Sequence, residues 1–295
     1  MIEGDETTKE KEESSVDRVL YISAMILGLF VFDFSLAYLS LPSISLDLHA
    51  TVEIRWLVFI YFLPAIGVIA LIDPFLKRWD IHRLALIGVS IFTIGSALCA
   101  TALLFWQLVL YRLLQGIGGA FLIVFVWAMA TKYLKEKKRV LLLSVIGFVG
   151  GMVGSILGGV LIEYWSWHTL FLLQIPIGLL IYYLCLGLLP KDKFPFSVSI
   201  DKNFAGWLIA SLMLMVIGFS PYAEFGGIPT ILFLLIGLAV FVYVLIKKRK
   251  TEQWDLPKEK ILLSFVASFY VFLGSSLIFT LPFFLAKELG MRSIQ

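Results

Sequence analysis

The chain has 295 residues, of which 60% are apolar and only 15% are charged, and it carries a net charge of +3 at pH 7. Its mean hydropathy of +0.95 excludes an ordinary soluble globular domain. Runs of about 20 apolar residues, each long enough to cross a hydrocarbon core of about 30 Å as a helix, recur along the sequence. We therefore predict an all-α polytopic membrane helix bundle. The nine predicted spans are residues 19–46, 55–76, 84–104, 107–131, 140–162, 169–189, 203–220, 228–246 and 261–286.

The first 18 residues are polar and acidic and precede the first span. This composition predicts a short disordered tail rather than a cleaved signal peptide. Within the span that follows, Asp33 is the only acidic residue of the interior, and Pro42 lies near its end. An ionisable side chain inside a membrane span is costly and usually functional.

The fourth span carries Arg112 in a stretch that is otherwise apolar. Burying this charge costs from about 3 to more than 10 kcal/mol, so a partner is expected. Arg112 lies about 9 Å from the outer end of its span, and Asp33 lies at about the same depth if the first span enters from the opposite side. We predict that the two residues pair. The pair would act either as a proton relay or as a permanent packing contact, unless Arg112 instead extends its side chain to the surface.

The fifth span contains small residues at four-residue intervals. Such stripes let a second helix approach closely in lipid. This pattern predicts a tight helix–helix seam, either static or one along which helices slide. The two stripes are Gly150, Gly154 and Gly158, and Gly147, Gly151, Ser155 and Gly159.

The basic residues alternate strongly between the two predicted faces of the membrane. Most of the 24 Lys and Arg residues fall on the side of the N-terminus, whereas Arg55, Lys287 and Arg292 fall on the other side. The positive-inside rule then places the N-terminus in the cytoplasm. The same rule accounts for the basic runs KYLKEKKR and KKRK, so we expect no nucleic-acid partner.

No set of residues in the sequence indicates an enzyme. Cys99 and Cys185 are far apart inside apolar spans, which favours small packing residues over a metal site or a disulfide. The three histidines are scattered, and no metal-binding or Ser/His/Asp pattern is present. We expect no cofactor and no metal, and the partners expected are membrane lipid, protons and a small-molecule substrate.

Five segments of the chain resemble motifs of the major facilitator superfamily, in the drug:proton antiporter branch that has fourteen spanning helices. They are DFSLAYLSLPSI, RWLVFIYFLP, YRLLQGIGGA, GGMVGSILGG and WSWHTLFLLQIPIG. The third resembles the fourth-helix motif, and the fourth resembles the antiporter motif of helix five, with Gly159 at its end and Ser155 in place of the proline. Tyr38 stands where the first-helix motif has an asparagine.

The resemblance implies proton-coupled export of small molecules. The candidate proton-coupling residues are Asp33 and Arg112, the pair predicted above, and the resemblance places spans one, four and five around the substrate cavity. The aromatic residues on these spans suit lipophilic or cationic compounds, although they could equally face lipid. The candidate cavity residues are Phe34, Tyr38, Gln115 and Phe121.

The loop between helices two and three is thought to control gating in the family, where it reads G-x-L-x-D-R-x-G-R. The corresponding segment here is DPFLKRWDIHR, with Lys77 at the acidic position and Asp80 at the second glycine. The candidate gating residues are Asp73, Arg78, Asp80 and Arg83.

The resemblance also divides the chain. Residues 1–18 form the cytoplasmic tail, 19–189 the six-helix N-terminal half, 190–260 two extra spans, and 261–295 the first helix of an incomplete second half. We therefore expect a fragment or one part of a split transporter in the cell membrane, with a second chain supplying further helices. Two alternatives are open: an uptake carrier for a small solute, and a non-transporting partner of a full-length relative.

Overall fold

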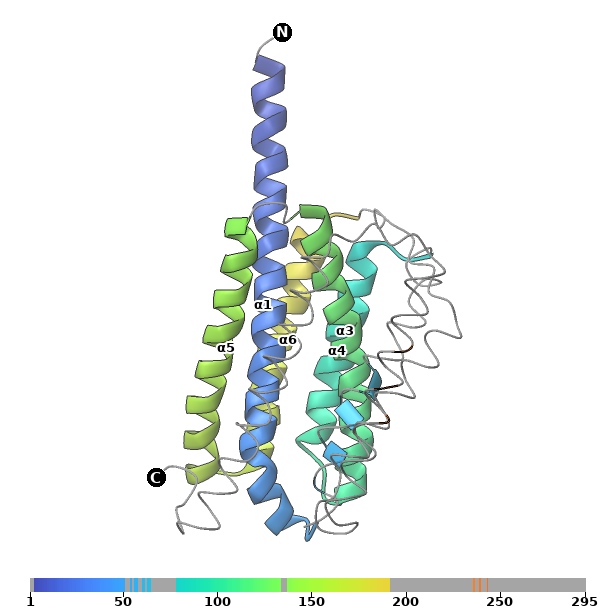
Figure 1. Cartoon of the computed structure of the whole chain (residues 1–295), viewed down its shortest axis with the longest axis vertical. Helices are drawn as coiled ribbons and strands as arrows, with labels where there is room; N and C mark the ends of the chain where they lie inside the picture. Colours follow the sequence, from blue (N-terminus) through green and yellow to red (C-terminus); the bar gives the residue numbers. More distant parts are fainter. Residues whose placement is uncertain are drawn as a thin grey trace. The chain divides into compact units, whose positions relative to one another are not determined.

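The structure is a computed structural model of the 295-residue chain. It describes residues 3–50, 78–133 and 137–191 continuously, and single positions or pairs between 54 and 64 and at 236, 239 and 243. All the regular elements in this described part are helices (Figure 1). They are α1 (Glu3–Asp47), α3 (Ile81–Cys99), α4 (Phe105–Tyr133), α5 (Lys137–Tyr164) and α6 (Trp167–Leu188).

The chain is a polytopic helical membrane protein, as predicted. Among the described residues, four helical segments are long and apolar enough to cross a membrane: Val16–Ala37, Ile81–Cys99, Phe105–Val126 and Trp167–Leu188. In the fifth predicted span, α5 runs for 28 residues. The predicted span at 55–76 and the three predicted after residue 200 lie almost wholly outside the described residues. The chain divides into two compact units, and all five helices belong to the first, Met1–Ile200.

Helix α1 is longer than the first predicted span, because it already begins at Glu3. The prediction that the acidic segment is a disordered tail was therefore wrong. Glutamate and lysine have high helix propensity, and a segment that continues an existing helix does not need its own nucleation step. The 45 residues of α1 extend over about 67 Å, and Figure 1 shows the N-terminal end projecting beyond the neighbouring helices.

The other end of α1 is shaped by a proline and a capping motif. Pro42 lies inside the helix, where it cannot donate a backbone hydrogen bond. His49 then adopts a positive φ of 52°, and the amide of Ala50 donates to the carbonyl of Ser45 at 3.1 Å. This six-to-one bond across a left-handed residue is a Schellman motif, which satisfies a terminal carbonyl and ends the helix.

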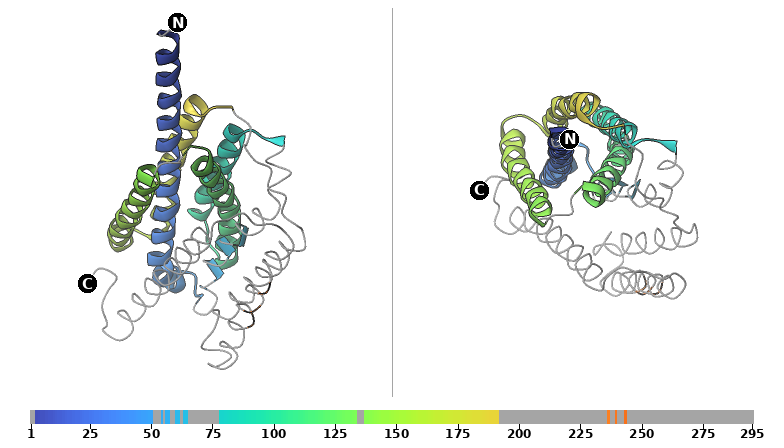
Figure 2. Two further views of the ribbon diagram at one scale, coloured as in Figure 1. Left: turned by 45° about the horizontal axis from the view of Figure 1, so that its top comes forward. Right: turned by 90° about the horizontal axis from the view of Figure 1, so that it is seen from above.

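The helices form two closely packed pairs connected by α6. Helix α1 packs most extensively against α5, and α3 packs most extensively against α4, while α6 contacts both α1 and α3. Figure 2, seen from above, shows α6 between α1 and α3. At the start of α6, the Trp167 indole donates to Asp47 at 2.9 Å, and a His168 ring nitrogen lies 3.1 Å from the carbonyl oxygen of Ala102. These contacts connect α6 to the end of α1 and to the segment between α3 and α4.

The largest apolar core lies between α1, α3, α4 and α6. The outward faces of α5 and α6 instead expose large apolar side chains, among them Ile156, Leu179 and Tyr183. Such exposure is expected for residues that contact lipid, because lipid tails are as apolar as the side chains themselves.

The first predicted glycine stripe of α5 lies on α1. A Cβ atom added at Gly150 would lie 2.8 Å from the carbonyl oxygen of Gly28, and one at Gly154 would lie 3.0 Å from that of Phe32. One turn further on, a Cβ at Gly158 would lie 2.8 Å from the Leu36 side chain. The two backbones are therefore in direct contact, because α5 carries no side chains along this line.

Candidate functional site

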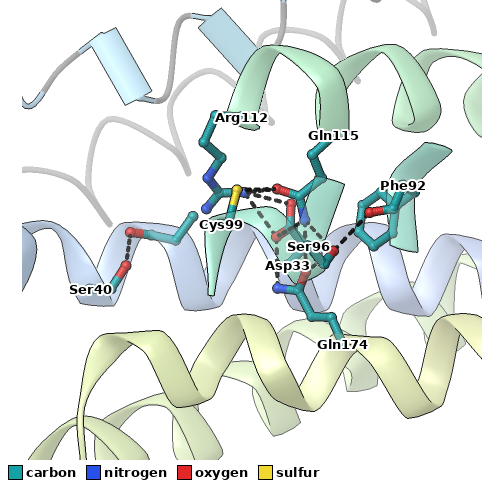
Figure 3. A network of polar contacts seen from close by, with 9 residues as sticks. Asp33, Ser40, Phe92, Ser96, Cys99, Arg112, Gln115 and Gln174 are labelled. Atoms are coloured by element: carbon teal, nitrogen blue, oxygen red, sulfur yellow. Dashed lines mark hydrogen bonds and ion pairs between the residues drawn. The ribbon is translucent and has the colours of Figure 1, made fainter. Parts of the chain in front are cut away.

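The two charged residues that the sequence predicts to pair are buried together. The Arg112 guanidinium donates from Nη1 to both carboxylate oxygens of Asp33, at 3.0 Å and 3.2 Å. Figure 3 shows this contact. Asp33 has 0% of its surface exposed and Arg112 has 2%. Arg112 therefore does not extend to the surface in this structure. The ion pair joins α1 to α4 and offsets much of the burial cost of each charge.

Gln115 lies one turn from Arg112 on α4 and connects the ion pair to further polar groups. Its oxygen accepts a 2.8 Å hydrogen bond from Arg112, and its amide nitrogen lies 3.3 Å from Asp33 Oδ1. The same nitrogen lies 2.8 Å from the Ser96 hydroxyl and 2.7 Å from Gln174 Oε1. Gln115, a candidate cavity residue, is thus fully buried and engaged with protein groups.

Helices α3 and α6 complete the network. The Gln174 amide donates to Asp33 Oδ1 at 2.8 Å, and the Ser96 hydroxyl lies 2.9 Å from both Gln174 Oε1 and the carbonyl oxygen of Phe92. The absence of a side chain at Gly95 brings Ser96 into this position, because a Cβ there would lie 2.7 Å from the backbone of Gln115. Side chains from α1, α3, α4 and α6 therefore form one buried polar network around the Asp33 carboxylate.

Two aromatic rings lie beside the guanidinium. The Cζ atom of Arg112 lies 4.6 Å from the ring centroid of Phe171 on α6 and 5.4 Å from that of Tyr61. At these distances the rings attract the cation through their negative faces. Arg112 is therefore stabilised by Asp33, by Gln115 and by aromatic surfaces together.

The two cysteines occupy different surroundings. Cys185 is part of the apolar core, as the sequence predicts. Cys99 is also buried, but its sulfur lies 3.9 Å from the side-chain oxygen of Gln115, so it borders the polar network. Both are free thiols.

The other candidate cavity residues do not share one environment in the described part of the chain. Phe121 belongs to the apolar core, and its ring centroid lies 6.1 Å from that of Trp79. Phe34 is half-buried on α1. The side chains of Tyr38 and Ser155 lie outside the described part of their helices. Of the antiporter-motif glycines, Gly150, Gly154 and Gly158 contact α1 as described, and Gly159 is half-buried.

The candidate gating residues form a local helix cap where they are described. Asp80 precedes α3 and accepts a 2.7 Å hydrogen bond from the amide of Arg83, whose guanidinium lies 3.5 Å from the same carboxylate. Arg78 is exposed, and Asp73 lies outside the described residues. Capping the positive end of a helix is a sufficient structural reason for an acid at position 80.

A family model decides the relationship of the chain to known proteins. The model of the Major Facilitator Superfamily matches residues 23–295. The chain belongs to the major facilitator superfamily. Since this is a family of transporters, the chain is a multi-pass membrane protein of a transporter class.

Several superfamily relatives are named for export or efflux. The chain is 30% identical over 264 residues to the cephamycin export protein CmcT of Amycolatopsis lactamdurans, covering 85% of this chain and 54% of that protein. It is 29% identical over 167 residues to the multidrug efflux pump SdrM of Staphylococcus aureus, covering 55% and 37%. It is 25% identical over 257 residues to multidrug resistance protein 3 of Bacillus subtilis, covering 84% and 49%. The chain thus spans about half, or less, of the length of these relatives.

The contributions of α3 and α6 to the polar network around Asp33 and Arg112 were not predicted from the sequence of this superfamily member. Ser96, Phe171 and Gln174 are uncharged, and nothing in their spacing marks them as partners of a charge in another helix. The one available signal was Gln174, which is a polar amide in the strongly apolar run LFLLQIPIGLL. A polar residue inside a membrane span usually faces a partner in the protein.

Proposed function

We propose that the chain takes part in proton-coupled export of small lipophilic or cationic compounds across the cell membrane. The observation that carries the proposal is the buried contact of 3.0 Å between Asp33 and Arg112. A carboxylate in a membrane span that is stabilised by a cation can exchange that interaction for a proton. Protonation of Asp33 would remove its charge, weaken its attraction to Arg112 and free α1 to move relative to α4.

The names of the relatives support the direction and class of transport in this proposal. CmcT is named for the export of cephamycin, and SdrM is named a multidrug efflux pump. The transport site of the superfamily lies between two sets of helices that rock around it. We therefore propose that transport also uses a second set of helices of the kind that the relatives carry.

Transport can be tested in membrane vesicles from cells that produce the protein, so that any further helices that transport requires are present, with ethidium as a lipophilic cationic probe and an imposed pH gradient. We expect the proton gradient to drive ethidium movement, and Asp33→Asn to abolish the driven flux while the protein stays folded. Arg112→Lys should also fail, because a compact ammonium does not reproduce the planar guanidinium. Glu163→Gln is the matched control, since Glu163 is an exposed acid at the end of α5.

The same assay separates the alternatives. Flux that follows the proton gradient in the same direction would indicate an uptake carrier. No flux in wild type, combined with stable copurification with a full-length relative, would indicate a non-transporting partner. Gradient-driven flux that survives Asp33→Asn would contradict the assigned coupling residue.

The proposed orientation has the N-terminus in the cytoplasm. Single cysteines introduced at positions 136 and 224 should react with a membrane-impermeant reagent from the inside and the outside, respectively. The native Cys99 and Cys185 are buried, which limits background labelling. The opposite pattern would overturn the orientation.

A further inference from the structure

Helix α6 contacts both members of the ion pair. Phe171 and Gln174 are three residues apart, so they lie on the same face of the helix. Both are buried, with exposed fractions of 1% and 0%. Phe171 contacts the cation and Gln174 donates to the anion.

The orientation of the Gln174 amide is determined by its other neighbours. Its oxygen lies 2.7 Å from the Gln115 amide nitrogen and 2.9 Å from the Ser96 hydroxyl, both of which can donate. The amide nitrogen is thereby directed to Asp33 Oδ1 at 2.8 Å. A flipped amide would place its oxygen against the carboxylate, where two acceptors would repel each other, and would turn its donors toward Gln115. The network therefore keeps an N–H donor aimed at the carboxylate.

The Phe171 ring interacts with Arg112 in a way that does not depend on the charge of Asp33. An aromatic face attracts a cation but exchanges no proton with it. If Asp33 becomes neutral, the guanidinium loses much of its attraction to the carboxyl group but keeps the contact with the ring. The titratable and charged groups around Asp33 in the described part of the chain are Arg112 on α4, Cys99 on α3 and Tyr61.

We propose that α6 positions the ion pair, with Gln174 as the positioning residue for Asp33 and Phe171 as the positioning residue for Arg112. This inference rests on the proposed function, in which Asp33 exchanges protons. The hydrogen bond from Gln174 sets the pH range in which Asp33 takes up its proton. The Phe171 ring keeps Arg112 in place while Asp33 is protonated and deprotonated.

The test is infrared difference spectroscopy of the purified full chain in lipid vesicles during a pH titration. The carboxyl band of Asp33 is identified by its loss in Asp33→Asn. Gln174→Met keeps the side-chain volume and removes the donor. A hydrogen bond to a charged group is worth about a tenfold change in equilibrium or more, and the Gln174 N–H stabilises the charged form of Asp33. The midpoint of the Asp33 band should therefore rise by about one pH unit or more in Gln174→Met. Gln107→Met is the matched control: Gln107 caps the start of α4 through the amides of Leu103 and Leu104 and should leave the midpoint unchanged.

A second variant addresses the aromatic contact and does not depend on the stability of the first. A fluorinated phenylalanine at position 171 keeps the shape of the ring and weakens its negative face. We expect it to raise the same midpoint by up to about half a pH unit, in line with the strength of a cation–π contact, because a guanidinium that the ring holds less firmly can move away once Asp33 is protonated and so favours the protonated form. The same replacement at Phe105, which contacts Trp106 rather than Arg112, should have no effect.

The outcomes distinguish this inference from the proposed function. A wild-type chain without a titrating Asp33 band would overturn both. A titrating band that is unchanged by Gln174→Met, or by fluorination at 171 if Gln174→Met does not fold, would overturn the positioning inference and leave proton exchange at Asp33 intact. A shift of the midpoint with unchanged secondary structure supports it, because a purely structural role would not move the titration.

Discussion

Helix α1 packs against its neighbours in two different ways. The face toward α5 carries Gly28, Phe32 and Leu36. There the glycine backbone of α5 contacts the backbone of Gly28 and Phe32 and the side chain of Leu36. Toward α4 and α6, helix α1 offers Asp33, and the contact is a network of charges and amides. The first contact requires that α5 has no side chains along the contact line, whereas the second requires that the polar atoms around Asp33 are paired. The apolar seam should therefore be sensitive to added volume, and the polar site should be sensitive to lost partners.

The largest effect should follow from breaking the ion pair on one side only. Arg112→Met leaves the Asp33 carboxylate buried without its cation, which should lower the free energy of unfolding by about 3–5 kcal/mol. The unfolding midpoint in detergent measures this. Adding Asp33→Asn to the same chain should restore part of the loss, because the uncompensated charge is then gone. A double variant as unstable as Arg112→Met would show that volume, not charge, governs this face.

The seam should respond more moderately and for a different reason. Gly154→Leu places a side chain where the Phe32 backbone lies 3.0 Å away, and we expect a loss of about 2–3 kcal/mol from overpacking. Gly187→Leu on α6 is the matched control, since nothing lies within 4 Å of an added Cβ at that position. Equal thermal stability of the two variants would contradict the close approach of α5 to α1.

A smaller effect is expected at the edge of the polar site. Ser96→Ala removes the hydroxyl that accepts from Gln115 and lies 2.9 Å from Gln174 Oε1, but it leaves the ion pair intact. The loss should be about 1 kcal/mol, the usual value for a neutral hydrogen bond. Thermal unfolding of the variant measures it, and a loss as large as that of Arg112→Met would mean that the network acts as a single unit.

The smallest effect should come from the other side of the seam. A Cβ atom added at Gly28 would meet only the Ile146 side chain, at 3.9 Å, which is ordinary contact. Gly28→Ala should therefore be neutral, or stabilising by up to about 1 kcal/mol through helix propensity. The seam then requires glycine on α5 but not at this position of α1. A clear destabilisation, seen in the same unfolding assay, would place the requirement on both helices.

The sequence allowed the ion pair to be predicted because its members are rare. Asp33 is the only acid in the interior of its span and Arg112 the only basic residue within the fourth span, and the rise of a helix relates their positions to depth. The glycine stripes were equally visible, but which of the two lies on α1 depends on helix rotation, which a repeating pattern does not determine. The structure assigns that role to Gly150, Gly154 and Gly158.

The contributions of α3 and α6 could not be predicted in the same way. Ser96 and Phe171 are common residue types in apolar helices, and their role depends on which helices are neighbours. Gln174 was visible as a polar residue, but its partner was not, because it lies 141 positions away in the chain. The helical N-terminal segment was missed because composition was weighed without its covalent continuity with a stable helix.

If Asp33 exchanges protons, as proposed, its complete burial has a kinetic consequence. With none of its surface exposed, the carboxylate cannot exchange a proton with water at the rate of collision. Exchange has to wait until the surrounding helices separate, and collective helix motions take microseconds to milliseconds. The rate of protonation is then the rate of opening, so it should be insensitive to buffer concentration and sensitive to lipid viscosity. Under the proposed function, the mobility of the helices would therefore determine the speed of proton transfer at Asp33.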